Sequence, residues 1–164
     1  MEIERKYKVN NLPSDLSQYK YKKIEQGYLC HNPTIRIRKS NEDYILTYKS
    51  KFGIEKKSEN SAVINHEVEL PLSKEAYDEL KAKTDGNIIY KTRYLIPIDN
   101  ELTAELDVFE DKLLGLILVE VEFPNEQLAD EFSPPSWFGK ELSSDQRFSN
   151  YHLSKLSDCK ELDS

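Results

Sequence analysis

Charged side chains recur at every second position in short segments of this sequence, and the members of each pair have the same sign. The acidic pairs are Glu2/Glu4, Glu67/Glu69, Glu105/Asp107 and Glu120/Glu122, and the basic pairs are Lys6/Lys8, Arg36/Arg38, Lys49/Lys51 and Lys91/Arg93. Clustered carboxylates are typical ligands of hard divalent cations such as Mg²⁺ or Mn²⁺. Clustered Lys and Arg side chains are typical donors to phosphate oxygens. If these pairs converge in space, they indicate a site for a metal ion and a polyphosphate.

The spacing of the pairs is that of β-strands, because side chains two residues apart lie on the same face of a strand. The segments that carry them are rich in Val, Ile, Tyr and Thr, and polar turns such as "SNED" (40–43) and "IDNE" (98–101) separate several of them. Short connections favour antiparallel pairing. We predict strands over residues 1–9, 22–31, 34–39, 44–51, 63–70, 88–97, 102–109 and 116–123.

A single charged pair is typical of the solvated face of a one-sided sheet and needs no function. The complete set is harder to explain in this way, because like charges on neighbouring strands repel each other. A bound ligand of opposite charge would offset that repulsion. Eight strands also suffice to close a barrel whose charged face points inward and whose apolar face is covered by helices.

Helices are fewer than strands. The sequence predicts helices over 73–84, after an N-cap at Ser73, over 125–132, after an N-cap at Asn125, and over 145–156, after an N-cap at Asp145. With no linker or repeat, the chain is expected to form one α+β domain over residues 1–164, dominated by an antiparallel sheet.

Composition narrows the classes of function. Charged residues make up 32% of the 164 residues, and the net charge of −7 disfavours a protein that coats nucleic acid. Cys30 and Cys159 show no disulfide or metal-ligand spacing, so a cytoplasmic location is expected. No leader and no apolar run of about 18 residues is found, so no membrane partner is expected. The acidic tail 158–164 is interpreted as a solvated end, and Trp137 with Phe138 as an anchor for a loop.

The Glu2-x-Glu4-x-Lys6 motif resembles the ExExK signature of the triphosphate tunnel metalloenzymes, also called the CYTH superfamily. Later blocks resemble that family's motifs in the same order, so the resemblance covers nearly the whole chain. These blocks are "EQGYL" (25–29), "IRIR" (35–38), "LTYKSK" (46–51), "EVEL" (67–70), "YKTRYLIP" (90–97), "ELDVF" (105–109), "GLILVEVEF" (115–123) and "DQRFSN" (145–150).

The resemblance implies a closed barrel of eight antiparallel strands with a charged lumen and a few helices packed outside. It assigns the metal, Mg²⁺ or Mn²⁺, chiefly to Glu2, Glu4 and Glu122, with Glu67, Glu69, Asp107 and Glu120 assisting a second metal or orienting water. It assigns the phosphates to Lys6, Arg36, Arg38, Lys49, Lys51, Lys91 and Arg93. Lys49, Glu69 and Glu120 are the expected catalytic residues, with Lys49 protonating or neutralising the leaving phosphate.

Two positions depart from the family pattern. Lys8 stands where relatives often have an apolar residue, so it lies either at the tunnel rim or in the substrate cradle. Asn65 stands where relatives often have a charge. The block containing His152 is expected to form a helix that plugs one end of the tunnel.

The resemblance favours hydrolysis of inorganic tripolyphosphate to pyrophosphate and phosphate, with nucleoside triphosphates as slower substrates. Two alternatives stay open: a thiamine triphosphatase or class IV adenylate cyclase on the same scaffold, and a non-catalytic sensor of polyphosphate or nucleotide. The expected partner is a small-molecule triphosphate, and the chain is expected to act as a monomer or homodimer.

Overall fold

The computed structural model describes residues 1–13, 15–54, 62–99 and 101–162. All the predicted strands form, with bounds that differ from the expected ones by one to three residues because strand ends depend on pairing. They are β1 (Glu2–Val9), β2 (Lys20–Cys30), β3 (Thr34–Ser40), β4 (Asp43–Ser50), β5 (Val63–Pro71), β6 (Asp85–Pro97), β7 (Thr103–Phe109) and β8 (Ile117–Glu122).

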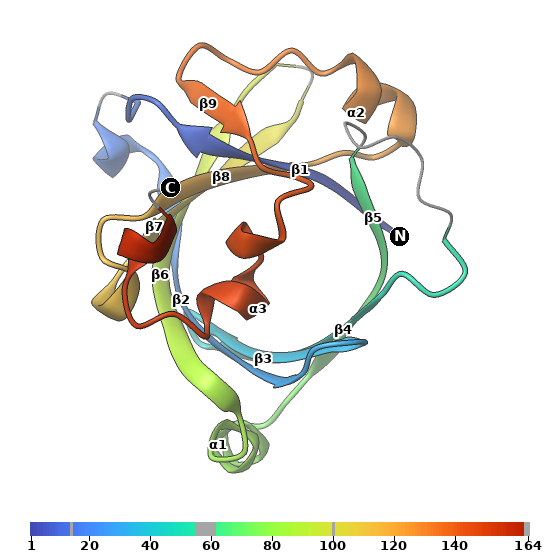
Figure 1. Cartoon of the computed structure of the whole chain (residues 1–164), viewed down its shortest axis with the longest axis vertical. Coiled ribbons are helices and arrows are strands. Elements are labelled where there is room, and N and C mark those ends of the chain that lie inside the picture. Colours follow the sequence, from blue (N-terminus) through green and yellow to red (C-terminus); the bar gives the residue numbers. More distant parts are fainter. Residues whose placement is uncertain (14, 55–61, 100, 163–164) are drawn as a thin grey trace.

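These strands close into an antiparallel barrel. Along the sheet the order is β5-β4-β3-β2-β6-β7-β8-β1, and an additional pairing of β1 with β5 joins the two ends. In this closing pair Glu2 lies opposite Asn65 and Glu4 lies opposite Val63. Figure 1 looks through the resulting ring of strands. The predicted eight-stranded barrel is therefore confirmed.

Two predicted helices form outside the barrel (Figure 1). In α1 (Lys74–Lys81) the Ser73 side chain accepts a hydrogen bond from the Ala76 amide, and in α2 (Glu126–Glu131) Asn125 does the same for the Leu128 amide. Short 3₁₀ turns form at η1 (Leu16–Gln18) and η2 (Asp111–Leu113). None of the helices in the described residues is both long and apolar enough to span a bilayer.

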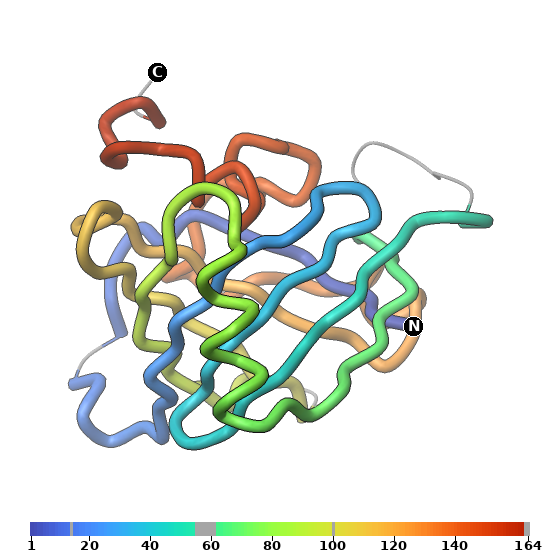
Figure 2. The backbone as a smooth tube through the Cα atoms, turned by 90° about the horizontal axis from the view of Figure 1, so that it is seen from below, coloured from blue at the N-terminus to red at the C-terminus, as the bar shows by residue number. Residues whose placement is uncertain are grey.

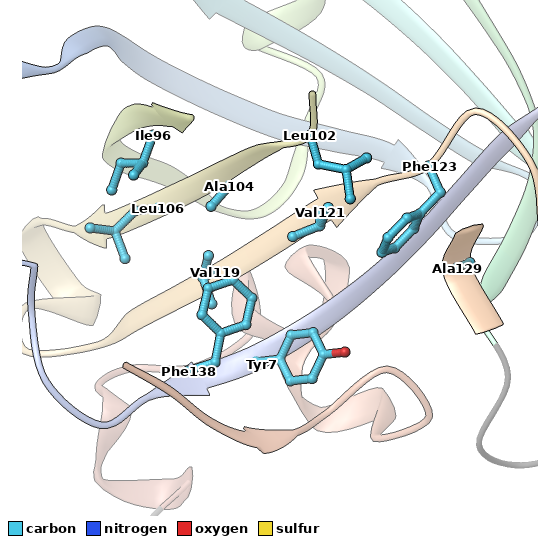
Figure 3. Packing of buried hydrophobic residues seen from close by; sticks show 10 residues of the cluster. All are labelled: Tyr7, Ile96, Leu102, Ala104, Leu106, Val119, Val121, Phe123, Ala129 and Phe138. Atoms are coloured by element: carbon cyan, nitrogen blue, oxygen red, sulfur yellow. The ribbon is translucent and has the colours of Figure 1, made fainter. Parts of the chain in front are cut away.

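The outer face of one wall carries an apolar core. Figure 3 shows its side chains, which project from β6, β7, β8 and β1 toward α2 and a further strand, β9 (Phe138–Glu141). Tyr7, Val119 and Val121 are each 2% exposed or less and alternate with inward-facing charged residues. The pleat of the strands thus separates charged and apolar residues onto the two faces of the wall.

The ninth strand was not predicted. β9 pairs with β1 beyond the point where β5 ends, with Val9 opposite Phe138 and Tyr7 opposite Glu141. The Arg5 guanidinium fixes the pairing, because its Nε and Nη2 donate to the Glu141 carboxylate at 2.8 and 2.6 Å. Phe138 packs into the outer core, in agreement with its interpretation as an anchor.

The prediction of one continuous helix over 145–156 is wrong. The segment instead forms η3 (Gln146–Phe148), α3 (Asn150–Leu153) and a later turn, η4 (Cys159–Leu162). Ser149 separates the first two elements with an extended backbone (ψ 144°), and its hydroxyl accepts a hydrogen bond from the His152 amide. A serine that caps a new helix in this way ends the preceding turn.

This C-terminal segment lies across one end of the barrel, as Figures 1 and 2 show. Four strand residues with inward-facing apolar side chains belong to the apolar core at this end: Tyr28, Ile89, Phe109 and Leu118. The residues of the C-terminal segment that pack against them are Leu142, Phe148, Leu153 and Leu162. The expected plug is therefore confirmed, and the lumen is apolar rather than charged at this end. The expected solvated tail is solvated only in part, because Lys160 and Glu161 are exposed while Leu162 is only 6% exposed and packs into this core. Residues 163–164 lie outside the described residues.

Candidate active site

The predicted site residues converge on one cavity of about 480 Å³ inside the barrel. Among the assigned side chains, its lining includes Glu2, Glu4, Glu67, Glu69, Glu120, Glu122, Lys6, Arg36, Arg38, Lys49, Lys51 and Arg93. Lys91 and Asp107 are the two assigned residues that do not line it. The period-two pattern therefore grouped most of these side chains on the face that lines the cavity, because alternation decides which side chains share one face of a strand.

Three carboxylates meet where β1 pairs with β8. Glu4 lies directly opposite Glu122, and one oxygen from each of Glu2, Glu4 and Glu122 lies within 4.8 Å of the others. Burial raises the pKa of Glu2, and burial with the neighbouring Glu120 and Glu2 charges raises that of Glu4 well above its usual range. Burial and the surrounding glutamates raise the pKa of Glu122 to about 7. Crowded oxygen donors of this kind fit a hard divalent cation, whose charge would remove the repulsion between them.

Lys49 supplies a positive charge beside this group. Its Nζ lies 2.8 Å from Glu2 Oε1 and 3.2 Å from Glu67 Oε2. Burial disfavours the ammonium, but the Glu4 and Glu2 carboxylates outweigh it and raise the pKa of Lys49. The side chain therefore remains charged at neutral pH and offsets part of the negative charge of the acidic group.

The opposite side of the cavity carries guanidinium groups with few anionic partners. Arg36 Nη2 donates to Thr47 Oγ1 at 3.1 Å, while its Nε is buried and has no hydrogen-bond partner among the described residues. Arg38 Nε donates to Gln26 Oε1 at 2.9 Å. Burial, with the Arg36 and Arg93 charges, lowers the pKa of Arg38 to about 9. Crowded cations with unused donors are the arrangement expected of an anion site.

Lys91, Arg93 and Asp107 form a separate buried group. Asp107 Oδ1 accepts from Arg93 Nε at 2.7 Å, and its Oδ2 accepts from Arg93 Nη2 at 2.9 Å and pairs with Lys91 Nζ at 2.8 Å. Burial opposes the charge of Asp107, but the two cations lower its pKa. Burial lowers the pKa of Lys91 to about 7 despite this ion pair. Both oxygens of Asp107 are thus engaged away from the three carboxylates, and Arg93 also has Glu105 Oε2 at 3.3 Å.

The remaining assigned residues lie along the cavity toward its closed end and mouth. Lys6 Nζ donates to the Phe148 carbonyl at 2.8 Å and lies 3.4 Å from Glu120 Oε1. Burial opposes the charge of Glu120, but Lys6, Arg93 and Lys91 lower its pKa well below its usual range. Lys51 is exposed immediately after β4.

Lys8, which the sequence left undecided, is exposed and outside the cavity lining. Its Nζ lies 5.5 Å from the centre of the Phe148 ring at the plugged end. This position corresponds to the rim.

Sequence reasoning missed some residues in and behind the cavity wall. Gln26 does not line the cavity, but its amide oxygen accepts a hydrogen bond from Arg38, which does, and its period-two relation to Tyr28 was the available signal. The C-terminal segment also contributes polar side chains to the lining. Because this segment is not a strand, period-two alternation could not indicate them: Ser143, Ser144, Asp145, Gln146, Ser149 and Asn150. Among the described residues, no histidine belongs to the group that could hold a metal, and His31 instead stacks on Tyr151 at 3.9 Å.

Comparisons with known proteins agree with this geometry. Residues 1–155 match the CYTH domain. The chain is 35% identical to the inorganic triphosphatase of Nitrosomonas europaea, over 93% of this chain and 95% of that protein, and 31% identical to the inorganic triphosphatase of Acetivibrio thermocellus, over 94% and 93%. A crystal structure of an inorganic triphosphatase superposes with a TM-score of 0.66 at 33% identity, covering 94% of each chain. The chain therefore belongs to the CYTH domain family.

Proposed function

We propose that this protein is a divalent-metal-dependent triphosphatase that cleaves inorganic tripolyphosphate to pyrophosphate and phosphate. The observation that carries the proposal is one cavity with three crowded carboxylates on one side and sparsely paired guanidinium groups on the other. A metal ion would neutralise the carboxylates, and the phosphates of a linear triphosphate bound to that metal would neutralise the guanidinium groups. The inorganic triphosphatase activity of the two relatives, named above, supports the same substrate.

Glu2, Glu4 and Glu122 would hold the metal, Mg²⁺ or Mn²⁺, because their oxygens meet and their chemistry suits a hard cation. When bound there, the metal would neutralise phosphate oxygens and make a nearby water more acidic. Glu67, Glu69 and Glu120 line the same cavity, and we propose that they orient the attacking water or complete a second metal site.

The basic residues bind and orient the phosphate chain. Arg36 and Arg38 face the cavity from β3 and Lys6 from β1, and Lys51 meets the substrate at the mouth. In-line attack by water on a terminal phosphoryl group needs positioning and charge stabilisation rather than a covalent protein intermediate. Lys49, whose Nζ lies 2.8 Å from Glu2 Oε1, neutralises or protonates the leaving diphosphate. Lys91 and Asp107 act by holding Arg93.

The test is a matrix of substrates and metals. The purified protein is incubated with tripolyphosphate, thiamine triphosphate or ATP, each with Mg²⁺, Mn²⁺ or chelator, and the products are identified. We expect fastest release of phosphate and pyrophosphate from tripolyphosphate, and none in chelator. Fastest turnover of thiamine triphosphate, or formation of cyclic nucleotide from ATP, would replace this proposal with one of the other enzymes on this scaffold.

Two matched variants separate catalysis from passive binding. Glu4→Gln removes one donor from the three-carboxylate group and should lower kcat by at least about 100-fold. Glu75→Gln makes the same chemical change on the exposed surface of α1 and should leave turnover unchanged. Binding of tripolyphosphate by wild type without any turnover would identify a sensor instead of an enzyme.

A further inference from the structure

Gln26 is a fully buried polar residue for which the proposed reaction has no role yet. It lies on the inward face of β2, directly opposite Arg38 of β3, and is 0% exposed. Its Oε1 accepts a hydrogen bond from Arg38 Nε at 2.9 Å, and its Nε2 donates to the Tyr28 hydroxyl at 2.9 Å. Gln26 does not line the cavity, whereas both of its partners do.

The orientation of this amide is fixed by the chemistry of its partners. A guanidinium group has only donors, so the amide oxygen must face Arg38. The amide nitrogen then points to Tyr28, whose hydroxyl accepts. With both ends engaged and no contact with solvent, Gln26 holds the Arg38 side chain in one position.

Arg38, like Arg36, has a neutral hydrogen-bond partner, whereas two other arginines are paired with carboxylates. Arg93 pairs with Asp107 and Glu105, and Arg5 pairs with Glu141. Among the described residues, no carboxylate lies within ion-pair distance of Arg38. A neutral acceptor orients a guanidinium without cancelling its charge, whereas a carboxylate does both.

The charged groups around Arg38 do little to cancel its positive charge. Arg36 and Arg93 face it with positive charge, and Asp107 is the carboxylate whose charge acts on it most. Asp107 is itself bonded to Arg93 and Lys91. Positive charge at Arg38 therefore stays largely uncompensated in the absence of an anion.

We infer that Gln26 is a positioning residue for the triphosphate: it aims the Arg38 guanidinium into the cavity and, being neutral, leaves the charge of that group free for a phosphate. This inference rests on the proposed function. It explains why an amide, rather than a carboxylate of the same size, occupies a buried position bonded to arginine.

The test compares Gln26→Glu with Gln26→Leu, two substitutions of similar volume. KM and kcat for tripolyphosphate are measured with metal, and Kd for tripolyphosphate is measured by calorimetry in chelator. We expect Q26E, which gives Arg38 a carboxylate, to raise KM and Kd by about 10- to 100-fold, the range of a charge-assisted hydrogen bond. Q26L, which leaves Arg38 charged but unanchored, should raise them by about 3- to 10-fold. The fall in kcat should be smaller than the rise in KM for both variants.

Thermal unfolding provides the readout that a purely structural residue would not give. Q26E creates an ion pair with Arg38 and should unfold at or above the wild-type temperature, whereas Q26L leaves a buried guanidinium donor unpaired and should unfold below it. Substrate affinity and stability should therefore rank the two variants in opposite orders.

Several results would overturn the inference. The first is that Q26E binds tripolyphosphate with wild-type affinity, and the second is that Q26L binds it more weakly than Q26E does. The third is that Q26E fails to fold, because a carboxylate at this position should pair with Arg38 without disrupting the barrel. In each case the wild type still hydrolyses tripolyphosphate, which distinguishes these results from failure of the proposed function, where the wild type itself releases no phosphate.

Discussion

At the scale of single residues, the cavity keeps like charges together at a cost in stability. Glu4 and Glu122 face each other directly across β1 and β8, an arrangement that destabilises an antiparallel pair. Arg36 and Arg38 likewise share one face of β3. Because each group is repelled by its neighbours in the free protein, a ligand of opposite charge gains binding energy by relieving that repulsion.

The first prediction separates the cavity from its rim. Arg38→Ala should raise KM for tripolyphosphate by about 10- to 100-fold, because it removes charge-assisted hydrogen bonds to the substrate. Lys8→Ala also removes a cation, but an exposed one over the Phe148 ring, and should change KM by less than about threefold. Steady-state kinetics at one ionic strength checks both variants. Equal effects would mean that overall charge, rather than placement in the cavity, governs binding.

The second prediction concerns pH and stability in the metal-free protein. The pKa of Glu122 is about 7 in the folded protein and near 4.5 when unperturbed, so the folded state holds this proton more tightly than the unfolded state does. Its contribution to the free energy of unfolding is therefore fully present below about pH 4.5 and is lost as the pH rises to about 7.

Glu122→Gln should abolish that loss. In chelator at pH 8 the variant should unfold about 2–4 °C above wild type, which corresponds to roughly 1 kcal/mol after screening of this half-exposed group. At pH 5 the two proteins should unfold at similar temperatures. A variant less stable than wild type at pH 8 would contradict the raised pKa.

At the scale of elements, the two edges of β1 organise the site. One edge pairs with β8 from Glu4 to Lys8, and the other pairs first with β5 and then with β9. A single strand thus closes the barrel, contributes two carboxylates and a lysine to the cavity, and anchors the C-terminal segment, whose Leu142 amide donates to the Lys6 carbonyl at 2.7 Å. Displacement of β9 would therefore disturb the wall and the plug together.

The third prediction concerns the plug. Phe148 is 1% exposed and packs against the apolar end of the lumen. Phe148→Ala should lower the free energy of unfolding by about 3–5 kcal/mol through lost burial and a residual cavity. Phe52→Ala is the matched control, since Phe52 is 88% exposed, and should change it by less than about 0.5 kcal/mol. Denaturant titration checks both, and equal stabilities would show that the segment does not pack as described.

The sequence predicted the strands and their inward faces, but it did not predict the ion pairs across strands or β9. Period-two alternation is local, so it predicted the strands and the inward face that carries Glu2, Arg38 and Lys49. It could not reveal which charges neutralise each other, as Asp107 and Lys91 do, because that depends on pairing across strands. It also missed β9, whose four residues pair with a strand more than a hundred residues earlier in the chain.

At the scale of the whole molecule, the barrel has two apolar cores and a charged cavity between its walls. One core covers the outside of the wall from β6 to β1 (Figure 3), and the other fills the end of the lumen closed by the C-terminal segment. These cores hold the barrel closed around charges that repel one another. The stability of the molecule should therefore respond strongly to ions that bind in the cavity.

The last prediction uses this linkage to locate the two ligands. A ligand that binds only the folded state at 100 times its Kd adds about 2.7 kcal/mol to the free energy of unfolding, which corresponds to roughly 5–10 °C in Tm for a chain of this size. Mn²⁺ or Mg²⁺ alone should raise Tm, and so should tripolyphosphate in chelator, because each neutralises one side of the cavity.

Variants should separate these two shifts. Glu4→Gln should abolish the shift caused by metal alone and keep the one caused by tripolyphosphate. Arg38→Ala should keep the shift caused by metal and reduce the one caused by tripolyphosphate by about half or more. Each variant is the control for the other, since both alter a charge within the same cavity. If either substitution removed both shifts equally, metal and phosphate would not bind on opposite sides, and the division of the cavity into an acidic and a basic half would be wrong.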